Sequence, residues 1–146
     1  MDFESYQHNC ELIIETNYQL LDLFEEDLLQ SGLTSKTINR HLSNVDFYIN
    51  KYLLLEEPHS MEYGVSMIDG FLGDFFIRKC MWSTPGNIKS TAASIKKFYK
   101  SMLAHGKIDK KSYNQLCSEI KNGMESWQMN CEIYNDPDSP NPFYCF

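Results

Sequence analysis

The stretch LTSKTINRHLSNVDFYINKYL, from Leu33 to Leu53, predicts a helix with a sharply defined start. Thr34 suits the N-cap position, and Leu33 and Ile38 on either side of it have the spacing of a hydrophobic staple. Apolar residues then recur every three or four positions, at Ile38, Leu42, Val45, Ile49 and Tyr52. This spacing places them on one face, so we expect an amphipathic helix packed against a core.

A second stretch repeats this pattern fifty residues later. TPGNIKSTAASIKKFYKSMLAHGKID, from Thr84 to Asp109, offers Thr84 as an N-cap and Pro85 at the first helical position. Shifting the chain by fifty positions aligns Ile38 with Ile88, Leu42 with Ala92 and Val45 with Ile95. Free N–H groups and the helix dipole at such starts favour phosphates. The same echo also fits two ordinary capped amphipathic helices.

Helical periodicity extends over most of the rest of the chain. It covers Glu11–Gln30, Val65–Phe76 and a segment that reaches Cys131, for which Asp109 is a suitable N-cap. No segment alternates like a strand. We therefore predict a single all-α bundle of about five helices over residues 1–134, with the strongly apolar third helix at its centre. Residues 135–146 contain three prolines and are expected to form a non-helical tail.

Length and composition fit one small globular domain. The chain has 146 residues, of which 42% are hydrophobic, enough to build a core. It contains no apolar run long enough for a membrane helix, and its start lacks the basic segment of a secretory signal. Its five cysteines are irregularly spaced. We therefore expect a cytoplasmic protein with reduced thiols and no membrane partner.

Charge is distributed unevenly along the chain. The net charge of −7 argues against a nucleic-acid partner. However, residues 84–111 contain seven lysines and a single acid, whereas residues 1–33 contain eight acids and no lysine or arginine. The lysines form either a solvated helix face or a basic surface for phosphates, with the acidic ends turned away. Charge alone does not decide between these two interpretations.

Several segments resemble a known family. The Leu33–Leu53 stretch is similar to the second helix of the N-terminal, SAM-like core-binding domain of phage integrases and other tyrosine site-specific recombinases, where a Ser/Thr loop precedes Lys-Thr-Ile-x-x-Tyr/His-Leu-x-x-Leu-x-x-Phe. MIDGFLGDFFIRK, from Met67 to Lys79, resembles the family's third helix, and Thr84–Asp109 resembles its fourth, including the pair Phe98–Tyr99. The resemblance covers about residues 18–110.

This resemblance implies a DNA-binding clamp in which the second and fourth helices face duplex DNA. Carried over to this chain, the DNA-binding residues are Thr34, Ser35, Lys36, Thr37, Arg40, Thr84, Asn87, Lys89, Ser90 and Lys97, and Lys107 extends the basic edge. The cations would neutralise phosphates, and the hydroxyl and amide groups would set the register. The overall acidity departs from the family, whose DNA-binding domains are usually more basic.

The chemistry of these recombinases is absent from the chain. It requires several arginines, a His-x-x-Arg motif and a tyrosine nucleophile in a second domain, whereas this chain has only two arginines and no His-x-x-Arg. Tyr144 near the end therefore lacks electrostatic support as a nucleophile. Cys-x-x-Cys and His-x-x-x-His pairs are also missing. We expect no catalytic residue, no metal site and no cofactor.

The alternative function is a protein-interaction or oligomerisation module that kept the recombinase-type fold and lost DNA binding. Its acidic first helix, or the aromatic tail with Phe143, Tyr144 and Phe146, would then contact a partner protein or a second copy of the chain. A small enzyme is the third class, and it has the least support because no catalytic motif is recognisable in the sequence.

Overall fold

The computed structural model describes residues 2–138, and this part of the chain contains helices and no strands. The all-α prediction is therefore confirmed, while most of the predicted non-helical tail, residues 139–146, lies outside the described part. The helices are α1 (Phe3–Gln30), α2 (Ser35–Asn50), η1 (Tyr52–Leu54), η2 (Met61–Ser66), α3 (Ile68–Gly70), η3 (Phe71–Phe75), α4 (Phe76–Lys79), α5 (Pro85–Ala104) and α6 (Lys110–Asn135).

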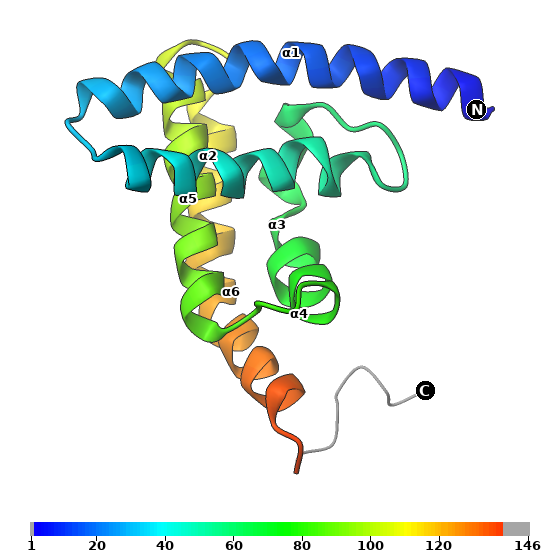
Figure 1. The fold of residues 1–146 in the computed structure, drawn as a ribbon, viewed down its shortest axis with the longest axis vertical. Coiled ribbons are helices and arrows are strands. Elements are labelled where there is room, and N and C mark those ends of the chain that lie inside the picture. The colour runs from blue at the N-terminus through cyan, green and yellow to red at the C-terminus, as the bar shows by residue number, and fades with distance from the viewer. Residues whose placement is uncertain (1, 139–146) are drawn as a thin grey trace.

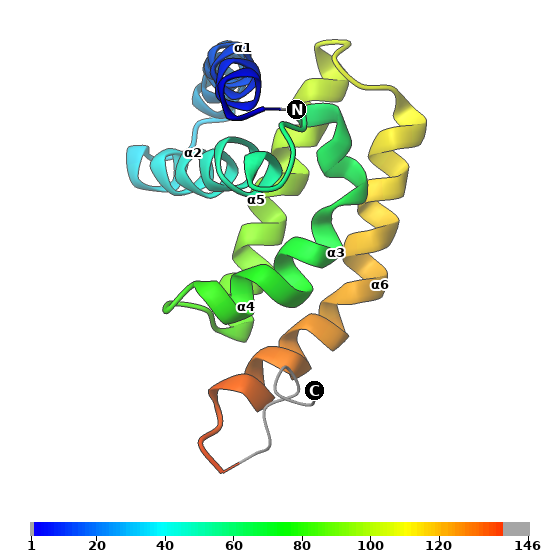
Figure 2. The ribbon, with the colours of Figure 1, turned by 90° about the vertical axis from the view of Figure 1, so that its right-hand side faces the viewer.

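Two antiparallel helix pairs cross each other. In Figure 1, α1 and α2 lie side by side and run across α5. Figure 2 shows α6 beside α5, with the segment from η2 to α4 in front of this pair and in contact with α6. Apolar side chains from all of these elements form one core cluster. The crossing of the two pairs positions the surfaces described below.

Side-chain caps start the helices where the sequence predicts them. Three cap residues accept a hydrogen bond from the backbone amide three residues ahead, which satisfies one of the free N–H groups of each first turn. The cap oxygens and the amides are Thr34 Oγ1 and Thr37 (3.3 Å), Thr84 Oγ1 and Asn87 (3.0 Å), and Asp109 Oδ1 and Ser112 (2.8 Å). Gly32 and Gly106, with φ of 76° and 73°, follow the ends of α1 and α5.

Helix α1 is longer than the apolar pattern indicates. It begins at Phe3 rather than near Glu11, because the Asp2 carboxylate caps it by accepting from the Ser5 amide at 2.7 Å. The Tyr6 hydroxyl donates to the carbonyl of Leu54 and ties this first part of α1 to η1. Few apolar side chains mark these turns, so periodicity alone misses them.

The predicted third helix is central but irregular. Its buried side chains include Ile68, Phe71 and Leu72, as expected, yet the segment is divided among η2, α3, η3 and α4. The Phe76 amide donates to the Phe71 carbonyl, which closes a π turn with one residue more than an α turn. A Cβ on Gly73 would lie 2.7 Å from Trp127 Cδ1, so this segment packs closely against α6.

Two buried phenols fix η2 to the core. The Tyr48 hydroxyl donates to the Gly64 carbonyl at 2.5 Å, and the Tyr99 hydroxyl donates to the Met61 carbonyl at 2.6 Å. Burial raises the pKa of both tyrosines because the charged phenolate would be desolvated. Both groups therefore remain neutral donors, and they link α2 and α5 to the same irregular segment.

Candidate nucleic-acid interface

Helices α2 and α5 meet through a small polar cluster. Ser94 of α5 is fully buried, and its Oγ lies 2.7 Å from Nδ1 of His41 on α2. Asn44, one turn further along α2, donates from Nδ2 to the same oxygen at 3.0 Å. A serine at this position leaves room for the two helices to approach each other, and its hydroxyl satisfies two polar groups of α2.

Positive charge from both helices surrounds this cluster. Burial lowers the pKa of His41, which is only 5% exposed, and the positive charges of Arg40 on α2 and Lys97 on α5 lower that pKa further. Two cations from different helices therefore act on the same imidazole. Because protonation is disfavoured, the imidazole at this crossing is held in its neutral form.

The polar residues continue away from the crossing along both helices. On α2, Lys36, Arg40 and Asn44 are four residues apart and share one helix face. On α5, the residues at the same face are spaced by three or four, and they are Asn87, Ser90, Ser94 and Lys97. We call the surface formed by Lys36, Arg40, Asn44, Asn87, Ser90 and Lys97 the α2–α5 corner.

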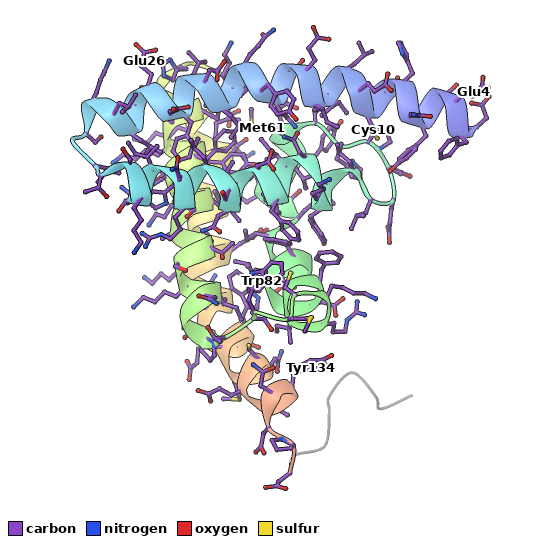
Figure 3. The ribbon with its side chains drawn as sticks, in the orientation of Figure 1. Glu4, Cys10, Glu26, Met61, Trp82 and Tyr134 are labelled. Atoms are coloured by element: carbon purple, nitrogen blue, oxygen red, sulfur yellow. The ribbon has the colours of Figure 1, made fainter. Side chains whose placement is uncertain are left out.

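The cations of the α2–α5 corner are not neutralised by acids. Within residues 2–138, Arg78 is the only lysine or arginine in an ion pair, with Asp74 at 2.5 Å. Lys36, Arg40 and Lys97 therefore present their full charge to solvent. Helix α1 contains most of the acids of the first 33 residues, and Figure 1 places it on the side of α2 opposite to the start of α5. Figure 3 shows Glu26 on the side of α1 that faces away from α2.

The structure brings some of the predicted DNA-binding residues together and separates others. Ser35, Thr37 and Lys89 accompany the corner residues on the first turns of α2 and α5. Thr34 and Thr84 cap those helices, so their side-chain oxygens are already engaged in the first turn. Both caps are exposed, at the outer ends of the two helices that form the corner (Figure 1).

Lys107 does not belong to the corner. It follows the C-terminal end of α5, whereas Thr84 precedes the N-terminal end. A helix of 20 residues is about 30 Å long, so the full length of α5 separates Lys107 from the start of that helix. In the sequence, Lys107 follows the basic stretch closely and was expected to extend the basic edge. In the structure, α5 runs away from its own start, so Lys107 lies far from Asn87 and Ser90.

A cavity that the sequence does not predict lies beside the α2–α5 corner. It has a volume of about 320 Å³ and lies between α2, α4 and α5. Its lining residues are Ser43, Asn44, Phe47, Phe76, Trp82 and Thr91. Figure 3 shows Trp82 below α2, between α5 and α4. The signal in the sequence was a tryptophan two residues before a helix cap, and this is too weak to predict a site.

Other kinds of site find no support in the described part of the chain. Residues 2–138 contain no cluster of three potential metal ligands, and the four cysteines described there are free. No helix within the same range combines the length and the apolar character needed to cross a bilayer. Comparisons with protein-family models, with curated proteins and with solved structures find no match to this chain.

Proposed function

We propose that this chain is a non-catalytic DNA-binding module that contacts duplex DNA through the α2–α5 corner, with the architecture of a recombinase core-binding domain. The observation that carries the proposal is the convergence of Arg40 and Lys97, from two helices and without ion pairs, on the same His41. The resemblance of both helices to the DNA-facing helices of tyrosine recombinases supports the same surface.

The corner has the two kinds of groups that a phosphate backbone requires. Lys36, Arg40 and Lys97 of the corner provide charge, and Lys89 near the start of α5 adds a fourth cation. The half-buried Asn87 and Ser90 each make one hydrogen bond within the protein and keep further polar capacity for a ligand. About four neutralised phosphates would give a slope of roughly −3.6 when the logarithm of affinity is plotted against that of salt concentration. Most acids of the first 33 residues lie on α1, on the side of α2 away from the start of α5, although Glu25 comes close to Ser43 of α2. The net charge of −7 therefore opposes binding at long range, and we expect binding at low salt.

The proposal is tested by titrating the protein with a labelled duplex at several salt concentrations. The double variant Arg40→Glu/Lys97→Glu should lose binding at low salt. A matched control is Lys110→Glu/Lys111→Glu, which changes the net charge by the same amount but lies beyond the far end of α5. The control should weaken binding by no more than a few fold, through the long-range field.

Two outcomes would contradict DNA binding at the corner. The wild-type chain shows no binding to duplex at low salt, or the two double variants weaken it equally. The second result would mean that total charge, and not the α2–α5 corner, determines the affinity.

A second candidate function is binding of a protein partner through α1. A groove of about 1060 Å³ lies between the N-terminal half of α1 and the segment before η2. It is lined by exposed apolar side chains such as Phe3, Leu12 and Tyr63, with Glu56 and Glu57 at its edge. Exposed apolar surface of this kind is typical of contact with another protein or with a second copy of the chain.

Light scattering at high salt tests this candidate. A specific oligomer that survives high salt and that dissociates in the variant Leu12→Asp would support it. A monomer at every salt concentration would rule out self-association through this groove.

A further inference from the structure

The 320 Å³ cavity beside the corner has two chemically different sides. Phe47, Phe76 and Trp82 supply aromatic rings, and the Trp82 ring meets the other two edge-on at centroid distances of 6.1 and 6.4 Å. Ser43, Asn44 and Thr91 supply polar groups. A site with flat apolar walls and a polar edge fits a planar ring that carries hydrogen-bonding groups at its rim.

The polar groups of the cavity are only partly used by hydrogen bonds within the fold. Asn44 donates one N–H to Ser94 Oγ, and within residues 2–138 its Oδ1 has no hydrogen-bond partner. The hydroxyls of Ser43 and Thr91 also make no hydrogen bond in that range, although Thr91 is only 4% exposed. None of these three oxygens is cut off from solvent, so each can exchange a bound water molecule for a polar group of a ligand.

Trp82 is fixed in place although it is half exposed. Its carbonyl accepts from Asn87 Nδ2 at 2.6 Å, and the next residue, Ser83, accepts at its own carbonyl from Asn135 Nδ2 at 2.9 Å. The side chain is nevertheless 57% exposed. The backbone at Trp82 is fixed while its indole is accessible. Little conformational entropy of the protein is therefore lost when another ring stacks on this indole.

We infer that this cavity receives an unpaired nucleobase, an inference that rests on the proposed DNA binding. Arg40 is one helical turn and Lys36 is two turns from Asn44 on the same face of α2, so phosphates next to the bound base would meet unpaired cations. A base in an intact duplex is stacked and paired and cannot enter. The ligand is therefore DNA with an extruded or single-stranded nucleotide.

The test compares two labelled DNAs of about 20 base pairs, one fully paired and one with a single extrahelical adenine, a length sufficient for the several phosphate contacts expected. By fluorescence anisotropy, the wild-type protein should bind the bulged duplex roughly tenfold more tightly, as expected for stacking of one base on an aromatic ring. Trp82→Ala should remove this preference and leave the affinity for paired duplex within about twofold.

Met81→Ala is the matched control. Met81 is the neighbouring residue, is fully exposed and does not line the cavity, so this variant should keep the preference for the bulged duplex. Trp82→Phe retains an aromatic ring and should keep most of the preference, which distinguishes lost stacking from a disturbed fold. Circular dichroism of each variant should match that of the wild type.

The outcomes separate this inference from the proposed function. Equal binding of both DNAs by the wild type, or equal effects of Trp82→Ala and Met81→Ala, overturns the base site. If the paired duplex still binds and Arg40→Glu/Lys97→Glu abolishes that binding, the corner remains a DNA surface. Absence of binding to either DNA at low salt overturns both.

Discussion

Helix α5 is crossed by two neighbouring helices, and it meets each of them through a serine. At the crossing with α2, Ser94 contacts His41 and Asn44, and both Ser94 and His41 are buried. At the crossing with α1, Ser101 donates to Asp27 Oδ2 at 2.5 Å, and the same carboxylate lies 3.1 Å from Nε2 of His105. The two serines are seven residues apart, two turns along the same face.

The two crossings differ in solvent exposure and therefore in what they contribute. The side chains of Asp27 and His105 are each about one third exposed, so water and salt weaken their attraction. At the α2 crossing, Ser94 and His41 are buried and the imidazole is kept neutral, so solvent replaces their mutual hydrogen bond poorly. We infer that the buried crossing holds the corner in shape, whereas the exposed one adds little stability.

The largest expected difference comes from enlarging the two serines. Ser94→Leu forces a bulky side chain into a fully buried helix contact and leaves two polar groups of α2 without a partner. It should lower the free energy of unfolding by about 3 kcal/mol or more. Ser101 is also buried, but its partners Asp27 and His105 reach solvent, so Ser101→Leu should cost less, about 1 to 2 kcal/mol. Urea denaturation measures both, and equal losses would contradict the comparison.

A smaller effect is expected from pH. The pKa of His41 is lowered in the folded protein, so the unfolded chain binds more protons as the pH falls below about 6.5. The stability contributed by neutral His41 is thus complete at pH 7 and declines as the pH falls from the unfolded toward the folded pKa. His41→Gln should remove this part of the pH dependence of the free energy of unfolding, measured by urea denaturation at pH 7 and pH 5. An unchanged difference between the two pH values would contradict this prediction.

The smallest effect concerns the exposed crossing. A double-mutant cycle with Asp27→Asn and His105→Gln should give a coupling energy of at most about 0.5 kcal/mol, because exposed pairs are screened. The corresponding cycle with His41→Gln and Ser94→Ala should give about 1 kcal/mol or more. Reversed magnitudes in these urea measurements would show that exposure does not govern the two crossings.

Local features of the fold were predictable from the sequence. Thr34, Thr84 and Asp109 cap helices as expected, because a cap depends on residues only three positions apart. The start of α1 was missed, since Asp2 acts before any apolar repeat begins. The central third helix was predicted, but its irregular turns were missed, because they depend on close contacts with Tyr52 and Trp127, which lie far away in the chain.

The candidate site was only partly predictable. Arg40 and Lys97 were identified through the resemblance, but their convergence on His41 depends on how α2 crosses α5. The cavity with Trp82 draws residues from three elements, so no single stretch of sequence reveals it. The position of Lys107 was also not predictable, because it depends on the direction of α5, beyond whose C-terminal end it lies.

The π turn between Phe71 and Phe76 sets the direction in which the ring of Phe76 points. Their rings pack 5.7 Å apart although they are five positions apart, a contact that regular α geometry would not align. Deleting one residue from this turn would restore a regular helix and rotate everything after it by about 100°. Phe76 would then lose its ring contact with Trp82. The aromatic side of the cavity with Trp82 therefore depends on the one extra residue in this turn.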